Sequence, residues 1–160
     1  MADMLTLAAH LPLVEYAAGQ VVIQEGTTTG SIWVLVSGSL EVRKDGVQVN
    51  AVAHPGALLG EVAVLLGKGH SASVIAAEPS LLRYAKDGRA LLDSDPQIST
   101  FVAIGLAERL DFVTTYLADL KAQYGDAPGL AMVSDVLAKL AARTGPTARP
   151  GSAREPDPEY

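Results

Sequence analysis

The pattern of apolar residues between positions 13 and 86 predicts an all-β region. Short runs rich in Val, Ile and Leu alternate with glycines, as expected for strands joined by tight turns. The clearest runs are residues 21–23, 32–36, 40–42 and 47–49. Asp45-Gly46 between the last two suits a type I′ hairpin turn. Closely spaced strands of this kind indicate a β-roll or jelly-roll barrel.

The apolar period becomes helical after residue 86. Asp87 can cap a short helix through residue 92, and Asp95 followed by Pro96 can begin a long one. Apolar residues then recur at alternating steps of three and four, at Ala103, Leu106, Leu110, Val113, Leu117, Leu120 and Tyr124. This stripe can pack on the β-roll of its own chain or form a homodimer through 103–124. Its regularity favours the dimer, because inward-packing helices usually have a broader apolar face.

The expected fold class is mainly β with C-terminal helices: a β-roll or jelly-roll barrel with a short internal helix and a long C-terminal helix. One domain is expected at 13–124, with the roll at 13–86 and helices at 87–124. A lead-in at 1–12 precedes it. A further helix at 128–143 and a flexible, Pro- and Gly-rich tail at 144–160 are expected to follow it.

Composition narrows the classes of protein to consider. The chain has 160 residues, enough for one well-packed domain, and contains no cysteine. A formal charge of −6 and the lack of any Lys/Arg cluster argue against nucleic acid as a partner. There is no signal-like start and no apolar stretch long enough to span a membrane, so we expect a soluble, cytoplasmic protein.

The stretch from Gly60 to Val74 is the most informative motif. Gly60-Glu61 follows a predicted strand and begins a short apolar helix, after which a glycine loop returns to another strand. The first turn of such a helix presents unpaired backbone N–H groups and the positive end of the helix dipole. With the hydroxyls of Ser71 and Ser73 nearby, the stretch has the ingredients of an anion cradle.

This stretch resembles the phosphate-binding cassette of the cyclic-nucleotide-binding domain family. The family pattern is Gly-Glu, small and apolar residues, a short loop, then Arg-x-Ala-Ser/Thr-Val. Other segments resemble the family in the same order: residues 18–26 its early strand pair, 32–42 its next hairpin, and 106–110 the dimer-forming or lid-forming part of its C-terminal helix. The resemblance covers residues 13–124 and implies a module that binds cAMP or cGMP without any cofactor.

The resemblance also implies ligand-binding residues, namely Gly60, Glu61, Val62, His70, Ser71, Ala72 and Ser73. Gly60 and the following amides would hold the cyclic phosphate, and Glu61 would accept a hydrogen bond from the ribose 2′-hydroxyl. Ser71 and Ala72 would add phosphate contacts. Ser73 stands where a Thr or Ser can also touch a guanine base in the syn conformation.

His70 departs from the family pattern, because it stands at the position of the arginine. A guanidinium offers the phosphate a permanent charge and a planar fork of donors. A histidine with an ordinary pKa near about 6.5 is mostly neutral at neutral pH. Without a cation, a buried phosphodiester would lose about 1.5–3 kcal/mol of charged hydrogen bonding.

Each residue has a simpler alternative. Glu61 suits the first turn of a helix through the dipole alone, and His70 suits a surface loop equally well. Lys68 in the same loop is expected to be solvated. Ser71 and Ser73 are alternatively ordinary strand residues.

No catalytic or metal-binding set is evident in the sequence. There is no nucleophile with a base and an orienting group, and no P-loop. His10, His54 and His70 with Glu61 lack the His-x-His spacing of metal-binding jelly rolls. We therefore expect neither an enzyme nor a metal protein.

The leading hypothesis is a stand-alone regulatory sensor that binds a cyclic nucleotide and signals through its long C-terminal helix. The residues after that helix are too few for the helix-turn-helix module of the family's transcription factors. The alternative is a ligand-free interaction module that keeps the fold and binds an unknown protein partner.

Overall fold

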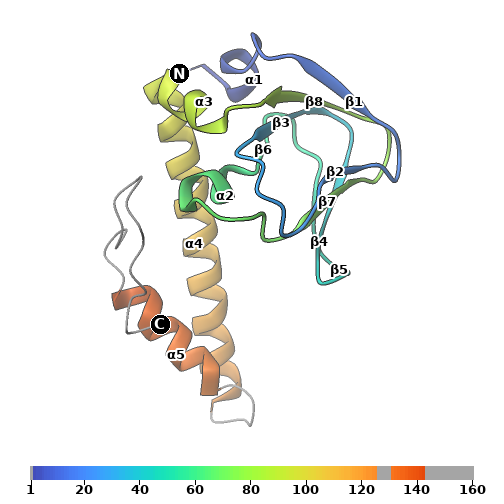
Figure 1. Cartoon of the computed structure of the whole chain (residues 1–160). Helices are drawn as coiled ribbons and strands as arrows, with labels where there is room; N and C mark the ends of the chain where they lie inside the picture. The colour runs from blue at the N-terminus through green and yellow to red at the C-terminus, as the bar shows by residue number, and fades with distance from the viewer. Residues whose placement is uncertain (1, 126–130, 143–160) are drawn as a thin grey trace. The chain divides into compact units, whose positions relative to one another are not determined.

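The computed structural model describes residues 2–125 and 131–142. The strands are β1 Leu13–Tyr16, β2 Val21–Ile23, β3 Ile32–Ser37, β4 Leu40–Lys44, β5 Val47–Val52, β6 Leu58–Leu59, β7 Ser73–Ala76 and β8 Ser80–Ala85. The helices are α1 Met4–Leu7, α2 Glu61–Leu66, α3 Gly88–Ser94, α4 Pro96–Tyr124 and α5 Ala131–Ala142 (Figure 1). The predicted fold class, mainly β with a short internal helix and C-terminal helices, is confirmed.

The strands form two four-stranded antiparallel sheets that close into a roll. Their orders are β1-β8-β3-β6 and β2-β7-β4-β5. Apolar side chains from both sheets fill the interior, namely Ile23, Trp33, Leu35, Leu40, Ala57, Leu59, Val74, Ala76 and Leu82. Trp33 lies at the centre, with its ring centroid 5.3 Å from that of Tyr84 and its Nε1–H donating to the Tyr16 hydroxyl at 3.1 Å.

The local predictions for strands, turns and helix starts are confirmed. All four predicted runs lie in strands, and Asp45 and Gly46 both adopt left-handed conformations between β4 and β5. The carboxylate of Asp87 accepts a hydrogen bond from the backbone N–H of Ala90, and that of Asp95 accepts one from Gln97. Each cap satisfies an N–H group that lacks an intrahelical partner.

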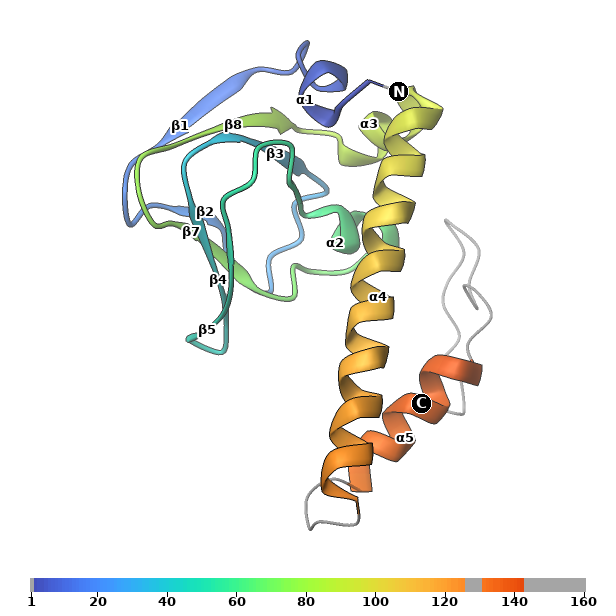
Figure 2. The ribbon, with the colours of Figure 1, turned by 180° about the vertical axis from the view of Figure 1, so that it is seen from behind.

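Contacts divide the chain into two compact units that meet at Gly105 and Leu106 within α4. The first unit holds the roll, α1–α3 and the first turns of α4, where Ile98 and Val102 are buried. In the second unit, α5 lies alongside the C-terminal part of α4 in both views (Figures 1 and 2). The helix expected at 128–143 corresponds to α5, while the tail expected at 144–160 lies outside the described residues. In residues 2–125 and 131–142, no helix is long and apolar enough to cross a membrane.

The start of α3 is packed tightly against the roll and α2. The backbone N–H of Gly88 donates to the carbonyl of Gly30 at 2.8 Å. A Cβ atom at Gly88 would lie 2.7 Å from Ile32 Cγ1 and 3.0 Å from Val64 Cγ2. Gly88 is therefore the point at which α3 meets both β3 and α2.

We expect Gly88→Ala to destabilise the first unit by about 1–3 kcal/mol, because the added methyl group overpacks the contact with Ile32 and Val64. Gly105→Ala is the matched control. It adds the same methyl in mid-helix where no atom lies within 4 Å, and it should stabilise by roughly 0.5–1 kcal/mol. Denaturant unfolding of both variants measures the difference. Equal effects would show that the contact at Gly88 relaxes without cost.

Candidate functional site

The backbone at Gly60 sets the start of the cassette helix. Gly60 has φ 92°, in the left-handed region, and precedes α2 as its N-cap residue. A Cβ atom here would lie 2.7 Å from the carbonyl oxygen of Ser31. Both the conformation and the close approach exclude a side chain. The predicted order of strand, glycine turn, short helix and glycine loop is confirmed, with Gly67 ending α2.

Backbone hydrogen bonds hold the end of the cassette against the connection between β2 and β3. The N–H of His70 donates to the carbonyl of Thr27 at 2.9 Å, and the N–H of Gly26 donates to the carbonyl of His70 at 2.8 Å. Two bonds in opposite directions fix the backbone of residue 70. The direction of the His70 side chain is therefore determined by the β2–β3 connection as well as by the cassette.

The side chain of His70 is turned into the protein. It is only 5% exposed, and its ring packs edge-on against Trp33 with centroids 6.1 Å apart. Its Nε2 atom lies 2.7 Å from the hydroxyl of Thr29. The alternative interpretation of His70 as a surface-loop histidine is therefore wrong. Burial disfavours the charged imidazolium and lowers the pKa of His70 below its ordinary value.

Thr29 is the residue of this site that sequence reasoning missed. It belongs to a run of three threonines between β2 and β3, and nothing in that run marks one of them as a partner of residue 70. The contact spans 41 positions in the sequence, so only the folded roll brings the two side chains together. No local pattern would have found it.

Glu61 and Val62 occupy the first turn of α2, as the resemblance implied. Glu61 is 4% exposed, and Val62 is half-buried. A carboxylate this deeply buried requires hydrogen-bonding partners. Among the described residues, no buried side-chain oxygen or nitrogen lacks one. The ribose contact expected for Glu61 stays a prediction.

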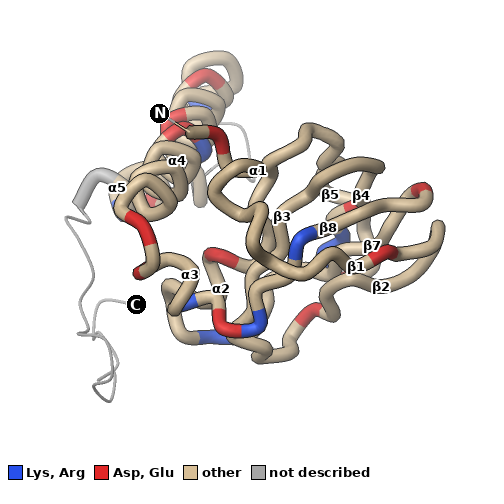
Figure 3. The backbone as a smooth tube through the Cα atoms, turned by 90° about the horizontal axis from the view of Figure 1, so that it is seen from above, with Lys and Arg blue, Asp and Glu red and all other residues tan. Residues whose placement is uncertain are grey.

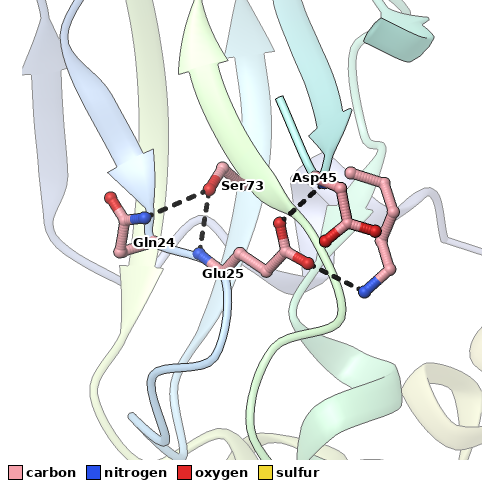
Figure 4. A network of polar contacts seen from close by, with 5 residues as sticks. Gln24, Glu25, Asp45 and Ser73 are labelled. Atoms are coloured by element: carbon pink, nitrogen blue, oxygen red, sulfur yellow. Dashed lines mark hydrogen bonds and ion pairs between the residues drawn. The ribbon is translucent and has the colours of Figure 1, made fainter. Parts of the chain in front are cut away.

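Ser73 is part of a network on the outside of the roll (Figure 4). Its hydroxyl accepts the backbone N–H of Glu25 at 2.9 Å, and the side-chain amide of Gln24 lies 3.5 Å away. The carboxylate of Glu25 in turn binds Lys44 Nζ at 2.8 Å and the N–H of Asp45 at 3.1 Å. The hydrogen bond from Lys44 lowers the pKa of Glu25.

This network connects β7 to the β4–β5 hairpin, and the Ser73 hydroxyl already accepts a hydrogen bond within it. The next residue along β7, Val74, points into the roll. Ser71 is exposed, and Ala72 is half-buried. The phosphate contacts of Ser71 and Ala72 stay predictions, as does the guanine contact of Ser73.

The cassette sequence from Gly60 to Ser73 contains one cation, Lys68, whose side chain is exposed. Three other cations in the described part of the chain form ion pairs with carboxylates: Arg43 with Glu41, Lys44 with Glu25 and Arg89 with Asp93. Figure 3 shows basic and acidic residues interspersed along the tube near α2 and α3. Position 70, where the family pattern has an arginine, therefore holds a buried imidazole and no permanent charge.

A surface cavity of about 480 Å³ lies apart from the cassette, against the N-terminal segment, the end of β8 and α3. It is lined by His10, Leu11, Pro12, Tyr84, Ala85, Lys86, Asp87, Ala90, Leu91 and Ser94. None of the expected ligand-binding residues lines it.

The comparisons with known proteins agree with this architecture. The family model of the cyclic nucleotide-binding domain matches residues 13–95, just over half of the chain. The chain belongs to this family.

Individual relatives are more distant. The cAMP-dependent protein kinase regulatory subunit of Yarrowia lipolytica is 34% identical over 65 residues, which cover 41% of this chain and 17% of that protein. The catabolite activator protein of Thermus thermophilus superposes with a TM-score of 0.62 at 23% identity, covering 88% of this chain and 85% of its own. A transcriptional regulator of Thermotoga maritima superposes with a TM-score of 0.63 at 16% identity, covering 76% and 99%. At these identities the two structures establish the fold alone.

The buried imidazole makes stability depend on pH. Because the pKa of His70 is lowered in the folded chain, the unfolded chain takes up the proton first as the pH falls through about 6.5. We expect the melting temperature to fall between pH 7 and pH 5. His70→Gln, which keeps a polar side chain but cannot titrate, should remove part of this decrease. Thermal unfolding followed by circular dichroism tests it, and identical pH profiles for the two proteins would contradict it.

Proposed function

We propose that this domain is a regulatory module that binds a cyclic nucleotide in the cassette from Gly60 to Ser73. The observation that carries the proposal is the left-handed backbone of Gly60, which immediately precedes α2. This segment lies within residues 13–95, the part of the chain that matches the family model. The amides of the first turn of α2 would hold the cyclic phosphate. The carboxylate of Glu61 would accept a hydrogen bond from the ribose. The proposed role is regulatory and not catalytic.

His70 would supply one N–H donor to the phosphate in place of a guanidinium fork. A hydrogen bond that involves a charged group contributes about 1.5–3 kcal/mol, against about 0.5–1.5 kcal/mol for a neutral one, so we take the deficit of a neutral donor as about 1–1.5 kcal/mol. That deficit corresponds to a roughly fivefold to tenfold weaker affinity. We therefore expect affinities for cAMP and cGMP below those of a site with arginine at this position.

Occupancy would be transmitted from α2 to α3 and then to α4. Gly88 at the start of α3 packs against Val64 of α2, so a displacement of the cassette helix reaches α3 directly. One residue, Asp95, separates α3 from α4. In the first turns of α4, Ile98 and Val102 are buried within the same unit as α2 and α3. These contacts support the proposal that a change in the cassette reaches the first turns of α4.

The alternative is a ligand-free interaction module on the same fold. The neutral, buried state of His70 favours it, because the cassette then lacks a cation suited to a phosphodiester. Nucleotide binding decides between the two. Protein stripped of nucleotide and titrated calorimetrically with cAMP and with cGMP provides the measurement.

We expect affinity to be higher at pH 6 than at pH 8. A bound anion favours imidazolium, so the pKa of His70 rises in the complex from its lowered value in the free protein. Binding then takes up a proton, and lower pH strengthens it. His70→Arg should strengthen binding roughly fivefold to tenfold and flatten the pH profile, because guanidinium stays charged. Glu61→Ala should weaken binding separately.

Two outcomes would change the assignment. No binding at millimolar nucleotide at either pH would exclude the sensor and leave the interaction module. Binding that is insensitive to pH and to His70→Ala would mean that the amides following Gly60 hold the phosphate without help from the imidazole.

We further propose that the stripe on α4 pairs with a second copy of the chain. In the second unit, Leu110, Val113 and Tyr124 are 50%, 44% and 55% exposed, respectively. These residues belong to the heptad-like stripe, whereas Glu108, Asp111 and Thr115 lie off it. The other stripe residues of this unit, Leu106, Leu117 and Leu120, are half-buried. Exposed apolar side chains at this spacing are typical of a helix that packs against a partner.

Leu110→Glu should shift a dimer to monomer while leaving the β-sheet signal in circular dichroism unchanged. Leu110 is exposed within its own chain, so the change should not unfold the monomer. Thr115→Glu, also exposed but on the opposite side of α4, adds the same charge and should leave the dimer intact. Light scattering measures the mass of each protein. A monomeric wild type, or equal effects of the two variants, would contradict the seam.

A further inference from the structure

The hydroxyl of Thr29 connects His70 to the backbone at the start of β3. Its Oγ1 atom lies 2.7 Å from His70 Nε2 and accepts the backbone N–H of Ser31 at 3.2 Å. The backbone of this segment is fixed on both sides. The carbonyl of Thr27 accepts the N–H of His70, and the carbonyl of Gly30 accepts the N–H of Gly88. Thr29 is therefore held in place independently of its own side chain.

The hydrogen-bonding capacity of a hydroxyl determines which ring nitrogen of His70 carries the hydrogen. A threonine hydroxyl has one hydrogen to donate and two lone pairs. One lone pair of Thr29 accepts the Ser31 N–H. If the hydroxyl donates to His70 Nε2, the hydroxyl hydrogen and the Ser31 N–H both have protein acceptors, and Nδ1–H is left for solvent or a ligand; in the reverse arrangement the hydroxyl hydrogen has no acceptor among the described residues. The separation of 2.7 Å agrees, since O–H donors make shorter hydrogen bonds than N–H donors.

Nε2 is then an acceptor, and the neutral ring carries its hydrogen on Nδ1. Among the described residues, Thr29 is the one hydrogen-bonding partner of the His70 side chain. No buried side-chain nitrogen in that part of the chain lacks a partner, so Nδ1 retains access to solvent. The Nδ1–H group is thus an available donor at the edge of an otherwise buried ring.

We propose that Thr29 is a positioning residue that holds His70 in its neutral Nδ1–H tautomer and so presents one uncharged donor at the cassette's arginine position. The tautomer itself does not depend on ligand binding. The consequence for affinity rests on the proposed nucleotide binding. In the opposite tautomer, Nδ1 would be a bare acceptor and would repel a phosphate oxygen.

The tautomer can be read directly by nitrogen-15 NMR of the imidazole ring at pH 8, where a histidine is neutral. His70→Gln identifies the signals. In the wild type, we expect Nδ1 to be protonated and Nε2 to be unprotonated. Thr29→Val keeps the shape but removes the hydroxyl, so the hydrogen should move wholly or partly to Nε2. Thr29→Ser should restore the wild-type pattern.

Thr28→Val is the matched control. Thr28 is exposed in the same loop, and no hydrogen bond of its hydroxyl is seen in the described part of the chain, so the variant should leave the tautomer unchanged. A wild type with Nε2 protonated would overturn the proposal. So would a Thr29→Val protein that keeps the wild-type pattern. Circular dichroism confirms that each variant is folded.

Calorimetric titration with cAMP and cGMP tests the consequence for binding. Thr29→Val should weaken affinity roughly twofold to tenfold, the equivalent of one neutral hydrogen bond, and Thr29→Ser should restore it. Equal affinity of wild type and Thr29→Val would overturn the positioning role. If even the wild type fails to bind millimolar nucleotide, the proposed function fails, while the NMR result still decides the tautomer.

Discussion

The structure depends on how closely other backbone segments approach the connection between β2 and β3. Three glycines pack against residues 26–31 of this connection, at distances that leave no room for a Cβ atom. Gly60 approaches the carbonyl of Ser31, Gly69 that of Gly26 and Gly88 that of Gly30. These glycines lie at the start of α2, at the end of the cassette loop and at the start of α3. One short segment thus fixes both ends of the cassette and the helix that follows the roll.

The same connection accounts for the state of His70. A side chain at position 70 that reached outward could be charged at little cost, because water would solvate it. The hydrogen bonds between the backbone of residue 70 and residues 26–27 place its ring between Thr29 and Trp33. Burial there lowers the pKa of the imidazole, and the Thr29 hydroxyl supplies a neutral partner. The replacement of a guanidinium by histidine therefore changes the cassette from a charged site to a neutral one.

Local sequence signals predicted the roll well because each reflects local physics. Asp87 and Asp95 cap their helices through residues two or three positions away, and Asp45-Gly46 adopts the left-handed conformations that these two residue types favour. The cassette backbone was predictable for the same reason, since a left-handed glycine before a short helix is a local requirement. The partner of His70 was not predictable. Its identity depends on which of three adjacent threonines the closed roll brings to the ring, and that is decided by pairing between strands far apart in the sequence.

The stripe on α4 shows a further limit of sequence reasoning. Its spacing is regular throughout, so the sequence alone cannot say which part packs on its own chain. In the structure, Ile98 and Val102 are buried within the first unit, whereas Leu110 and Val113 in the second unit are exposed. One continuous helix therefore has an N-terminal part anchored to the domain that contains the cassette and a C-terminal part with an apolar surface open to a partner. If two chains associate through Leu110 and Val113, as proposed above, the helix that carries this surface is the same one whose first turns are buried in the unit that contains the cassette, and substitutions at the two ends can separate the two roles.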